Sequence, residues 1–176
     1  MATLLIIISI MLWLAAFAAL FFRMVAAPAF SYLGLLMLSL AKDADEIPLI
    51  PINSTILIGW LAMTLIVIVA TLMQPDPIQQ QNRGVAYMLG GAIVGMTIGL
   101  LGVTFLSSVS MLYGVMVIAT AAGTFFGYLL FTNTPAGRAL SFGSGNFYTY
   151  LLAKGFPTAV AVMMAGVPLV ILAFRA

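Results

Sequence analysis

Six apolar runs, each close to the length that crosses a membrane, divide this 176-residue chain. They lie at residues 3–22, 24–41, 54–73, 85–106, 110–131 and 158–174, with short polar segments between most of them. About 20 consecutive apolar residues form a helix that spans a hydrocarbon core about 30 Å thick. Barrel strands would instead alternate polar and apolar residues in segments of about ten. The pattern therefore predicts an all-α, polytopic integral membrane protein with six transmembrane helices in antiparallel hairpins and no soluble domain.

The composition supports a membrane location and removes most enzyme classes. Only 6% of the residues are charged and the mean hydropathy is +1.24, whereas about a quarter of the residues in soluble domains are charged. The chain has neither cysteine nor histidine, so thiol chemistry, disulfides and the commonest metal ligand and general base are missing. We therefore expect no enzymatic activity, no metal and no cofactor.

The fourth and fifth runs carry small residues at intervals of four. These expected helix-packing residues are Gly91, Gly95, Gly99, Ala119, Gly123 and Gly127. Four-residue spacing places each set on one face of a helix, where the missing side chains let another helix approach closely. We expect these two faces to pack against partner subunits, and a contact within the chain is the alternative.

Ionisable groups are missing from the middle third of all six runs. Pumps need such groups at membrane depth, because lipid does not solvate the charge that they move. A proton carrier that works alone is therefore not expected. The interior hydroxyls belong to Thr64, Thr97, Thr104, Thr120, Thr124 and Tyr128. They could line a path for a solute, but we favour bonds to the helix backbone, which hydroxyls in membrane helices usually make.

Three of the four acidic residues lie within residues 43–46. The segment lacks the ligand spacing and the turn glycine of a calcium loop, so we favour a solvated loop over a cation site. The basic residues form no cluster, which argues against a nucleic-acid partner.

The basic residues predict an orientation in the membrane. An N-terminus outside the cytoplasm would leave four cations in the cytoplasmic loops and two on the other side. The four are Arg23, Arg83, Arg138 and Lys154, and the two are Lys42 and Arg175. We therefore expect both termini on the non-cytoplasmic side of the inner (cytoplasmic) membrane.

Three local features complete the predicted fold. Asn53 is expected to cap the third helix, and Pro168 to kink the last one. The connection at residues 132–157 is rich in glycine, serine and asparagine, and its aromatic stretch at 147–152 is expected to lie at the level of the lipid headgroups.

Two resemblances bear on function. The size, the layout and the Gly90-Gly91 and Gly95 region resemble the subunit J family of respiratory complex I, although that family's conserved third helix has no counterpart at residues 54–73. The strings Asn133-Thr134-Pro135 and Lys154-Gly155-Phe156-Pro157 resemble bacterial inner-membrane proteins associated with ExbB–ExbD energy-transducing complexes. Neither resemblance implies functional residues.

We therefore expect a non-catalytic subunit that scaffolds or stabilises a larger inner-membrane complex, with a proton-driven, ExbB–ExbD-like assembly as one candidate. Its expected partners are other integral membrane subunits and lipid, with no nucleic acid and no soluble substrate. The alternatives are a small transporter or channel for a neutral or apolar solute, an accessory subunit of a respiratory complex and an enzyme acting on lipids.

Overall fold

The computed structural model describes residues 2–22, 24–42, 47–75, 82–102, 105 and 108–173, the side chains of 172 and 173 excepted. Its principal helices are α1 (Ala2–Phe22), α2 (Ala26–Ser39), α3 (Ser54–Leu72), α5 (Val85–Leu101), α6 (Val109–Thr132) and α8 (Phe156–Ala173). A 3-10 turn at Arg138–Leu140 follows α6, and α7 (Phe147–Tyr150) leads through a π-helical turn at Leu151–Gly155 into α8. Within these described ranges the chain forms no strand.

The helices confirm the prediction of an all-α membrane protein. Four apolar segments are long enough to cross a membrane, namely Ala2–Phe22, Ser54–Leu72, Val109–Thr132 and Phe147–Ile171. Helices α2 and α5 are apolar but shorter, at 14 and 17 residues. Length and composition therefore identify four spans where the sequence predicted six.

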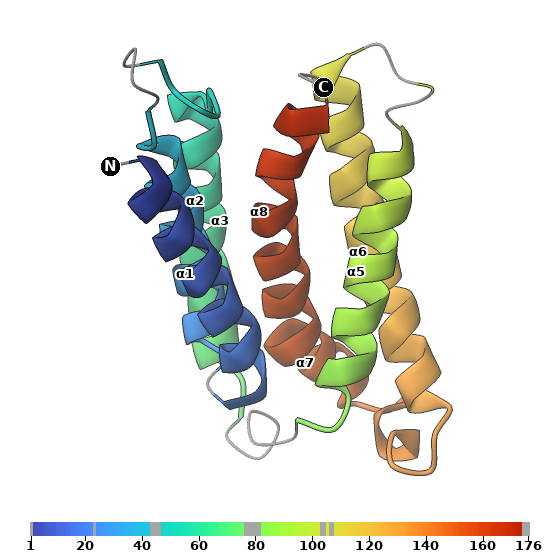
Figure 1. Cartoon of the computed structure of the whole chain (residues 1–176). Helices are drawn as coiled ribbons and strands as arrows, with labels where there is room; N and C mark the ends of the chain where they lie inside the picture. Colours follow the sequence, from blue (N-terminus) through green and yellow to red (C-terminus); the bar gives the residue numbers. More distant parts are fainter. Residues whose placement is uncertain are drawn as a thin grey trace.

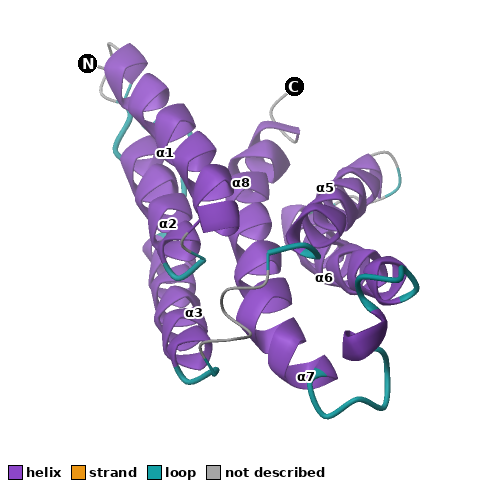
Figure 2. Cartoon of the chain, turned by 90° about the horizontal axis from the view of Figure 1, so that it is seen from below, coloured by secondary structure: helices purple, strands orange, loops and turns teal. Residues whose placement is uncertain are grey.

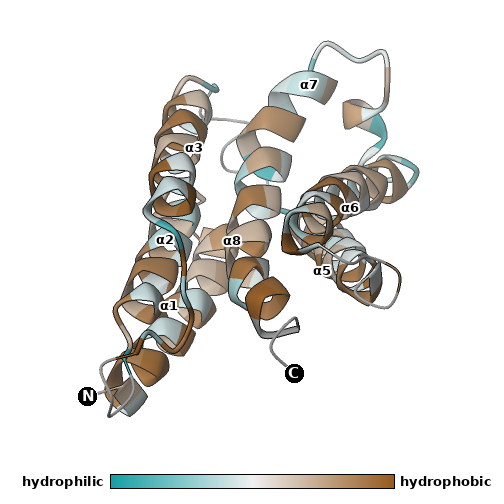
Figure 3. Cartoon of the chain, turned by 90° about the horizontal axis from the view of Figure 1, so that it is seen from above, coloured by the Kyte–Doolittle hydropathy of each residue, from teal (hydrophilic) through white to brown (hydrophobic). Residues whose placement is uncertain are grey.

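Helix α8 is the central element of the fold. Helices α1, α2 and α3 form one group beside it, and α5 and α6 pair closely on its other side (Figures 1 and 2). In the membrane-length segment that contains α8, 78% of the residues are buried inside the structure, whereas the share is 17% in α1 and 22% in α3. The helices around α8 are rich in apolar residues, drawn brown in Figure 3. Their surfaces that face away from α8 are therefore suited to contact with lipid or with partner helices.

The predicted helix boundaries are accurate at the N-terminus and less so towards the C-terminus. Helix α3 begins where the sequence predicted, and Asn53 caps it by accepting a hydrogen bond from the backbone N–H of Thr55 at 3.2 Å. Helix α5 ends at Leu101, before the predicted residue 106. The acidic segment at 43–46, Arg23, Thr104 and Arg175 lie outside the described residues.

The last helix corrects one prediction. It was expected to start at residue 158 after a loop, but α7, the π-helical turn and α8 form one continuous helical segment from Phe147. Within the aromatic stretch, Tyr148 is exposed whereas Phe147 and Tyr150 are buried, and the position of the stretch at the headgroup level stays a prediction. Phe147 and Tyr150 are buried because both rings pack against Tyr128 of α6, with ring centroids 4.9 and 5.5 Å away.

The π-helical turn has a local cause in the sequence. It ends just before Phe156 and Pro157. Proline has no N–H to donate, and its ring crowds the carbonyl four residues earlier, which here belongs to Ala153. The hydroxyl of Thr158 donates to the carbonyl of Lys154 at 2.7 Å, so the carbonyls of this turn find partners outside the regular α-helical pattern.

Candidate functional site

The six small residues predicted to pack helices lie in the seam between α5 and α6. A Cβ atom added to Gly91 would overlap the carbonyl oxygen of Gly123, and one added to Gly123 would overlap that of Gly91. A Cβ atom added to Gly95 would likewise overlap the carbonyl oxygen of Ala119. Backbone therefore touches backbone along this seam, a contact that only a missing side chain permits.

The two ends of the seam repeat the arrangement. A Cβ on Gly127 would overlap the carbonyl oxygen of Tyr87, and one on Gly99 would lie 2.6 Å from the Cα of Met116. For these faces the structure therefore shows the alternative, a contact within the chain. They meet each other within one chain, because α5 and α6 are joined by a short connection and present complementary small residues at the same heights.

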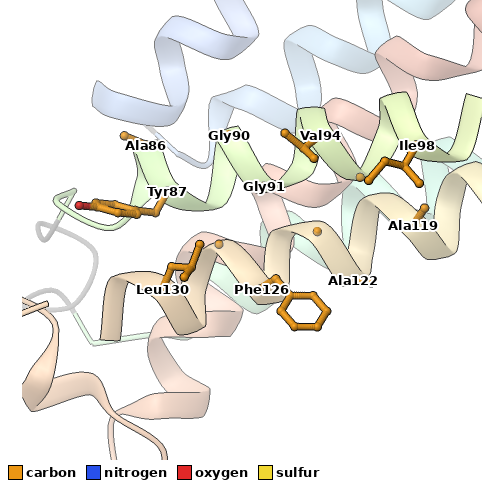
Figure 4. Close-up of a pocket in the computed structure, with 13 residues that line it drawn as sticks. Ala86, Tyr87, Gly90, Gly91, Val94, Ile98, Ala119, Ala122, Phe126 and Leu130 are labelled. Atoms are coloured by element: carbon orange, nitrogen blue, oxygen red, sulfur yellow. The ribbon is translucent and has the colours of Figure 1, made fainter. Parts of the chain in front are cut away.

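A groove of about 660 Å³ runs along the outside of the same hairpin (Figure 4). Its lining includes Gly90 and Ala122 together with seam glycines such as Gly91 and Gly123, and a Cβ added to Gly90 would meet no atom within 4 Å. The larger side chains along it belong to Val94, Ile98, Phe126 and Leu130, all exposed. The groove carries no ionisable side chain other than the phenol of Tyr87 at one end, so it suits an apolar occupant.

A polar cluster closes the end of the bundle where α7 lies, which we call the base. Lys154 in the π-helical turn is only 2% exposed, and its Nζ donates to Oδ1 of Asn82 at 2.8 Å. The side-chain amide of Asn82 in turn donates to the carbonyl of Phe21 at 2.6 Å. These bonds connect the end of α1, the segment before α5 and the last helix.

Two tyrosines extend the base towards the hairpin. The hydroxyl of Tyr128 donates to the carbonyls of Leu140 and Phe147, at 3.1 and 3.0 Å. The hydroxyl of Tyr150 accepts a hydrogen bond from the backbone N–H of Gly84 at 3.1 Å. The two phenol rings stack with an interplanar angle of 17°, so the base is both hydrogen-bonded and tightly packed.

The burial of Lys154 differs from the prediction, in which the last helix starts at residue 158 and this lysine lies in a loop. One feature of the sequence indicates the longer helix: residues 147–173 carry no charged side chain other than Lys154. They can therefore be taken as a single apolar segment that contains one lysine. Buried charges in membrane segments and π-helical turns often mark functional sites, but the bonds of Lys154 show that it also ties three segments together.

The hydroxyls inside the helices bond to backbone, as the sequence analysis favoured. Thr64, Thr97, Thr120 and Thr124 each donate to the carbonyl four residues earlier, over 2.7 to 2.9 Å. Tyr128 donates to the carbonyls of Leu140 in the 3-10 turn and Phe147 in α7. These described hydroxyls therefore donate to the backbone, and the transporter alternative stays a prediction.

The arrangement of the described residues does not point to a reaction. Within the part of the chain that the structure describes, no group of three or more His, Cys, Asp or Glu side chains could hold a metal ion. No family model, curated protein or solved structure matches the chain. The resemblances to complex I subunit J and to ExbB–ExbD-associated proteins therefore stay predictions.

Proposed function

We propose that this protein is a non-catalytic membrane subunit that binds a transmembrane helix of a partner through the outer groove of the α5–α6 hairpin. The groove is the observation that carries the proposal. It is apolar, it is open along both helices, and its hollow at Gly90 is bordered by exposed large side chains such as Val94 and Phe126. Helices associate in lipid mainly through close van der Waals packing, which a hollow of this kind permits.

The close contact between α5 and α6 makes the groove a rigid, preformed surface. Because Gly91, Gly95 and Gly123 hold the two backbones in contact, the spacing of the two helices that form the groove does not depend on side-chain rotamers. A preformed surface loses less conformational entropy when a partner binds. The assembly that we propose is an inner-membrane complex, and a proton-driven, ExbB–ExbD-like complex is one candidate for it.

We also propose that all six long helices cross the membrane. The 14 residues of α2 correspond to about 21 Å, less than the usual core of about 30 Å. However, α1 ends at the base and α3 starts at the opposite end (Figure 1), so α2 has to connect the two ends. Helix α5 connects the base to the start of α6 in the same way.

The described cations support an orientation with the base in the cytoplasm. Arg83, Arg138 and Lys154 lie on segments at the base, whereas Lys42 lies at the other end (Figure 1). Cytoplasmic loops are enriched in such residues. The chain contains no cysteine, so an impermeant maleimide added to intact cells should label Lys42→Cys and leave Gly145→Cys unlabelled. The reverse pattern would overturn the orientation.

The groove is tested by filling its hollow. Nothing lies within 4 Å of the Cβ position of Gly90, so the side chain of Gly90→Leu should start in open space and project into the groove. We expect melting in detergent to be unchanged, while the recovery of a stoichiometric partner falls about tenfold, equivalent to about 1.4 kcal/mol. The matched control is Gly114→Leu, since Gly114 has equally open space on α6 and lies outside the groove.

The outcomes separate this proposal from its competitors. Equal partner recovery with Gly90→Leu and Gly114→Leu would remove the groove from the interface. A wild-type chain that purifies alone from native membranes in mild detergent, and that conducts a solute in liposomes, would favour the transporter alternative instead.

A further inference from the structure

Away from the base, the two groups of helices beside α8 share little direct contact with each other. Helices α2 and α3 pack against α8 from one side, and α5 and α6 pack against it from the other. Between α3 and α6 lies a cleft of about 350 Å³, lined by residues that include Gly59, Trp60, Tyr113 and Val117. Movement of the hairpin relative to α3 would therefore disturb few direct contacts.

Hydrogen bonds hold the hairpin at the base. Tyr150 accepts from the N–H of Gly84, just before α5, and Tyr128 of α6 donates to the carbonyl of Phe147. The ammonium group of Lys154 donates a hydrogen bond to Asn82, which lies three residues before the start of α5. Both helices of the hairpin are thus fastened to the last helix at the same end.

The opposite half of the hairpin meets α8 through methionines. A Cβ atom on Gly166 would lie 2.9 Å from the sulfur of Met96 and 3.0 Å from that of Met116, so both thioethers rest over this glycine. Unbranched methionine side chains adapt readily to a shifted neighbour. On the other side of α8, the buried hydroxyl of Ser31 in α2 donates to the carbonyl of Ala161 at 2.7 Å. On the hairpin side of α8 the contact is therefore made by adaptable side chains, whereas on the α2 side it includes a buried hydrogen bond.

The cleft is bridged by an aromatic contact that can separate easily. Trp60 and Tyr113 meet edge to face, with ring centroids 6.4 Å apart and an interplanar angle of 73°. The indole N–H of Trp60 lies near the Tyr113 hydroxyl but makes no well-aligned hydrogen bond with the described residues. Separation of the rings would therefore break no strong polar bond.

We propose that the α5–α6 hairpin rocks as a rigid body on α8, pivoting at the hydrogen-bonded base and opening the cleft beside Trp60 and Tyr113. Rigid elements that move about a fixed point are a common form of conformational change. The glycine seam keeps the hairpin rigid, the base supplies the pivot, and the methionine contacts allow the far end to move. This motion does not depend on partner binding at the outer groove.

Spin labels can measure the motion directly, because the chain has no cysteine of its own. The upper pair is Ile58→Cys on α3 with Ile118→Cys on α6, and the lower pair is Leu72→Cys with Leu130→Cys on the same two helices. All four side chains are exposed, so labels there should not disturb the packing. In lipid nanodiscs, double electron–electron resonance should give a distance distribution about twice as wide for the upper pair as for the lower pair, because the pivot restricts the lower one.

Two further measurements complete the test. A pair within the hairpin, Ile98→Cys with Leu130→Cys, should give a distribution as narrow as the lower pair. Tyr150→Phe, which removes the hydroxyl bonded to Gly84, should broaden the lower pair. An upper pair as narrow as the lower one would overturn the proposal, and so would a hairpin pair as broad as the upper one.

Discussion

Helices α5 and α6 meet backbone against backbone, whereas α1 and α2 meet through a ring that lies over a glycine. In the hairpin, glycines face carbonyl groups at successive turns. Between α1 and α2, a Cβ on Gly34 would lie 2.7 Å from Nε1 of Trp13, and that indole donates to the carbonyl of Ser31 at 3.2 Å. A side chain can rotate away from an intruding atom, but a backbone that is fixed in a helix cannot.

The difference has consequences for stability and for surface. The hairpin forms a firm unit whose shape follows from its backbones, and it leaves an apolar groove on its outer side. The α1–α3 group is held by individual side-chain fits and by its contacts with α8. We expect substitutions in the two regions to differ in size and, more tellingly, in whether a second substitution can rescue them.

The largest effect should come from Gly91→Leu in the seam. The new side chain would collide with the carbonyl of Gly123, so the two helices would have to separate over several turns. We expect a loss of about 3 kcal/mol of stability, the upper end of the usual cost of overpacking, seen as a large fall in the melting temperature in detergent. Gly114→Leu, with open space around it, is the control. Equal melting of the two variants would contradict the backbone contact.

A smaller effect is expected at the base, which joins the two regions. Asn82→Ala removes an acceptor of the Lys154 ammonium and the donor to the carbonyl of Phe21. Hydrogen bonds to charged groups contribute about 2 kcal/mol, so the melting temperature should fall less than in the seam variant. Amide hydrogen exchange should rise at the end of α1 and at Gly84. Unchanged exchange at both places would show that Asn82 does not link them.

The smallest effect should come from Gly34→Ala between α1 and α2. The added methyl group would press mainly on the Trp13 ring, which can shift, and would lie 3.1 Å from the carbonyl oxygen of Ser9, so we expect a loss of about 1 kcal/mol. Combining it with Trp13→Leu should restore part of the loss relative to Trp13→Leu alone. No truncation of a neighbouring side chain should rescue Gly91→Leu in this way. The proposed difference between the two regions would be contradicted if Trp13→Leu did not rescue Gly34→Ala, or if truncation of a neighbouring side chain rescued Gly91→Leu.

The sequence predicted the hairpin better than it predicted the rest of the fold. Repeated small residues at Gly91, Gly95 and Gly123 signal close packing, but they do not say whether the opposing helix belongs to the same chain. Gly34 is a single glycine, and nothing in its neighbours indicates that Trp13 lies over it. A single contact such as that between Trp13 and Gly34 depends on how the helices are arranged in space. The periodicity of one segment does not contain that information.

The last helix shows a second limit of the sequence. Lys154 and Pro157 resemble a loop junction, because a charge and a proline usually interrupt a membrane helix. In the structure the π-helical turn accommodates the proline, and Asn82, far away in the sequence, pairs with the lysine. The partner that makes the charge tolerable could not be identified before the fold was known.

Crosslinking in native membranes tests most directly the claim that the outer groove receives a partner helix. A photoreactive maleimide attached to Val94→Cys would sit in the groove, and the same reagent on Ile58→Cys would sit on the exposed face of α3. We predict that the Val94 probe captures one defined membrane polypeptide and that the added substitution Gly90→Leu abolishes this product. Capture of lipid alone from Val94, as from Ile58, would contradict the proposed function.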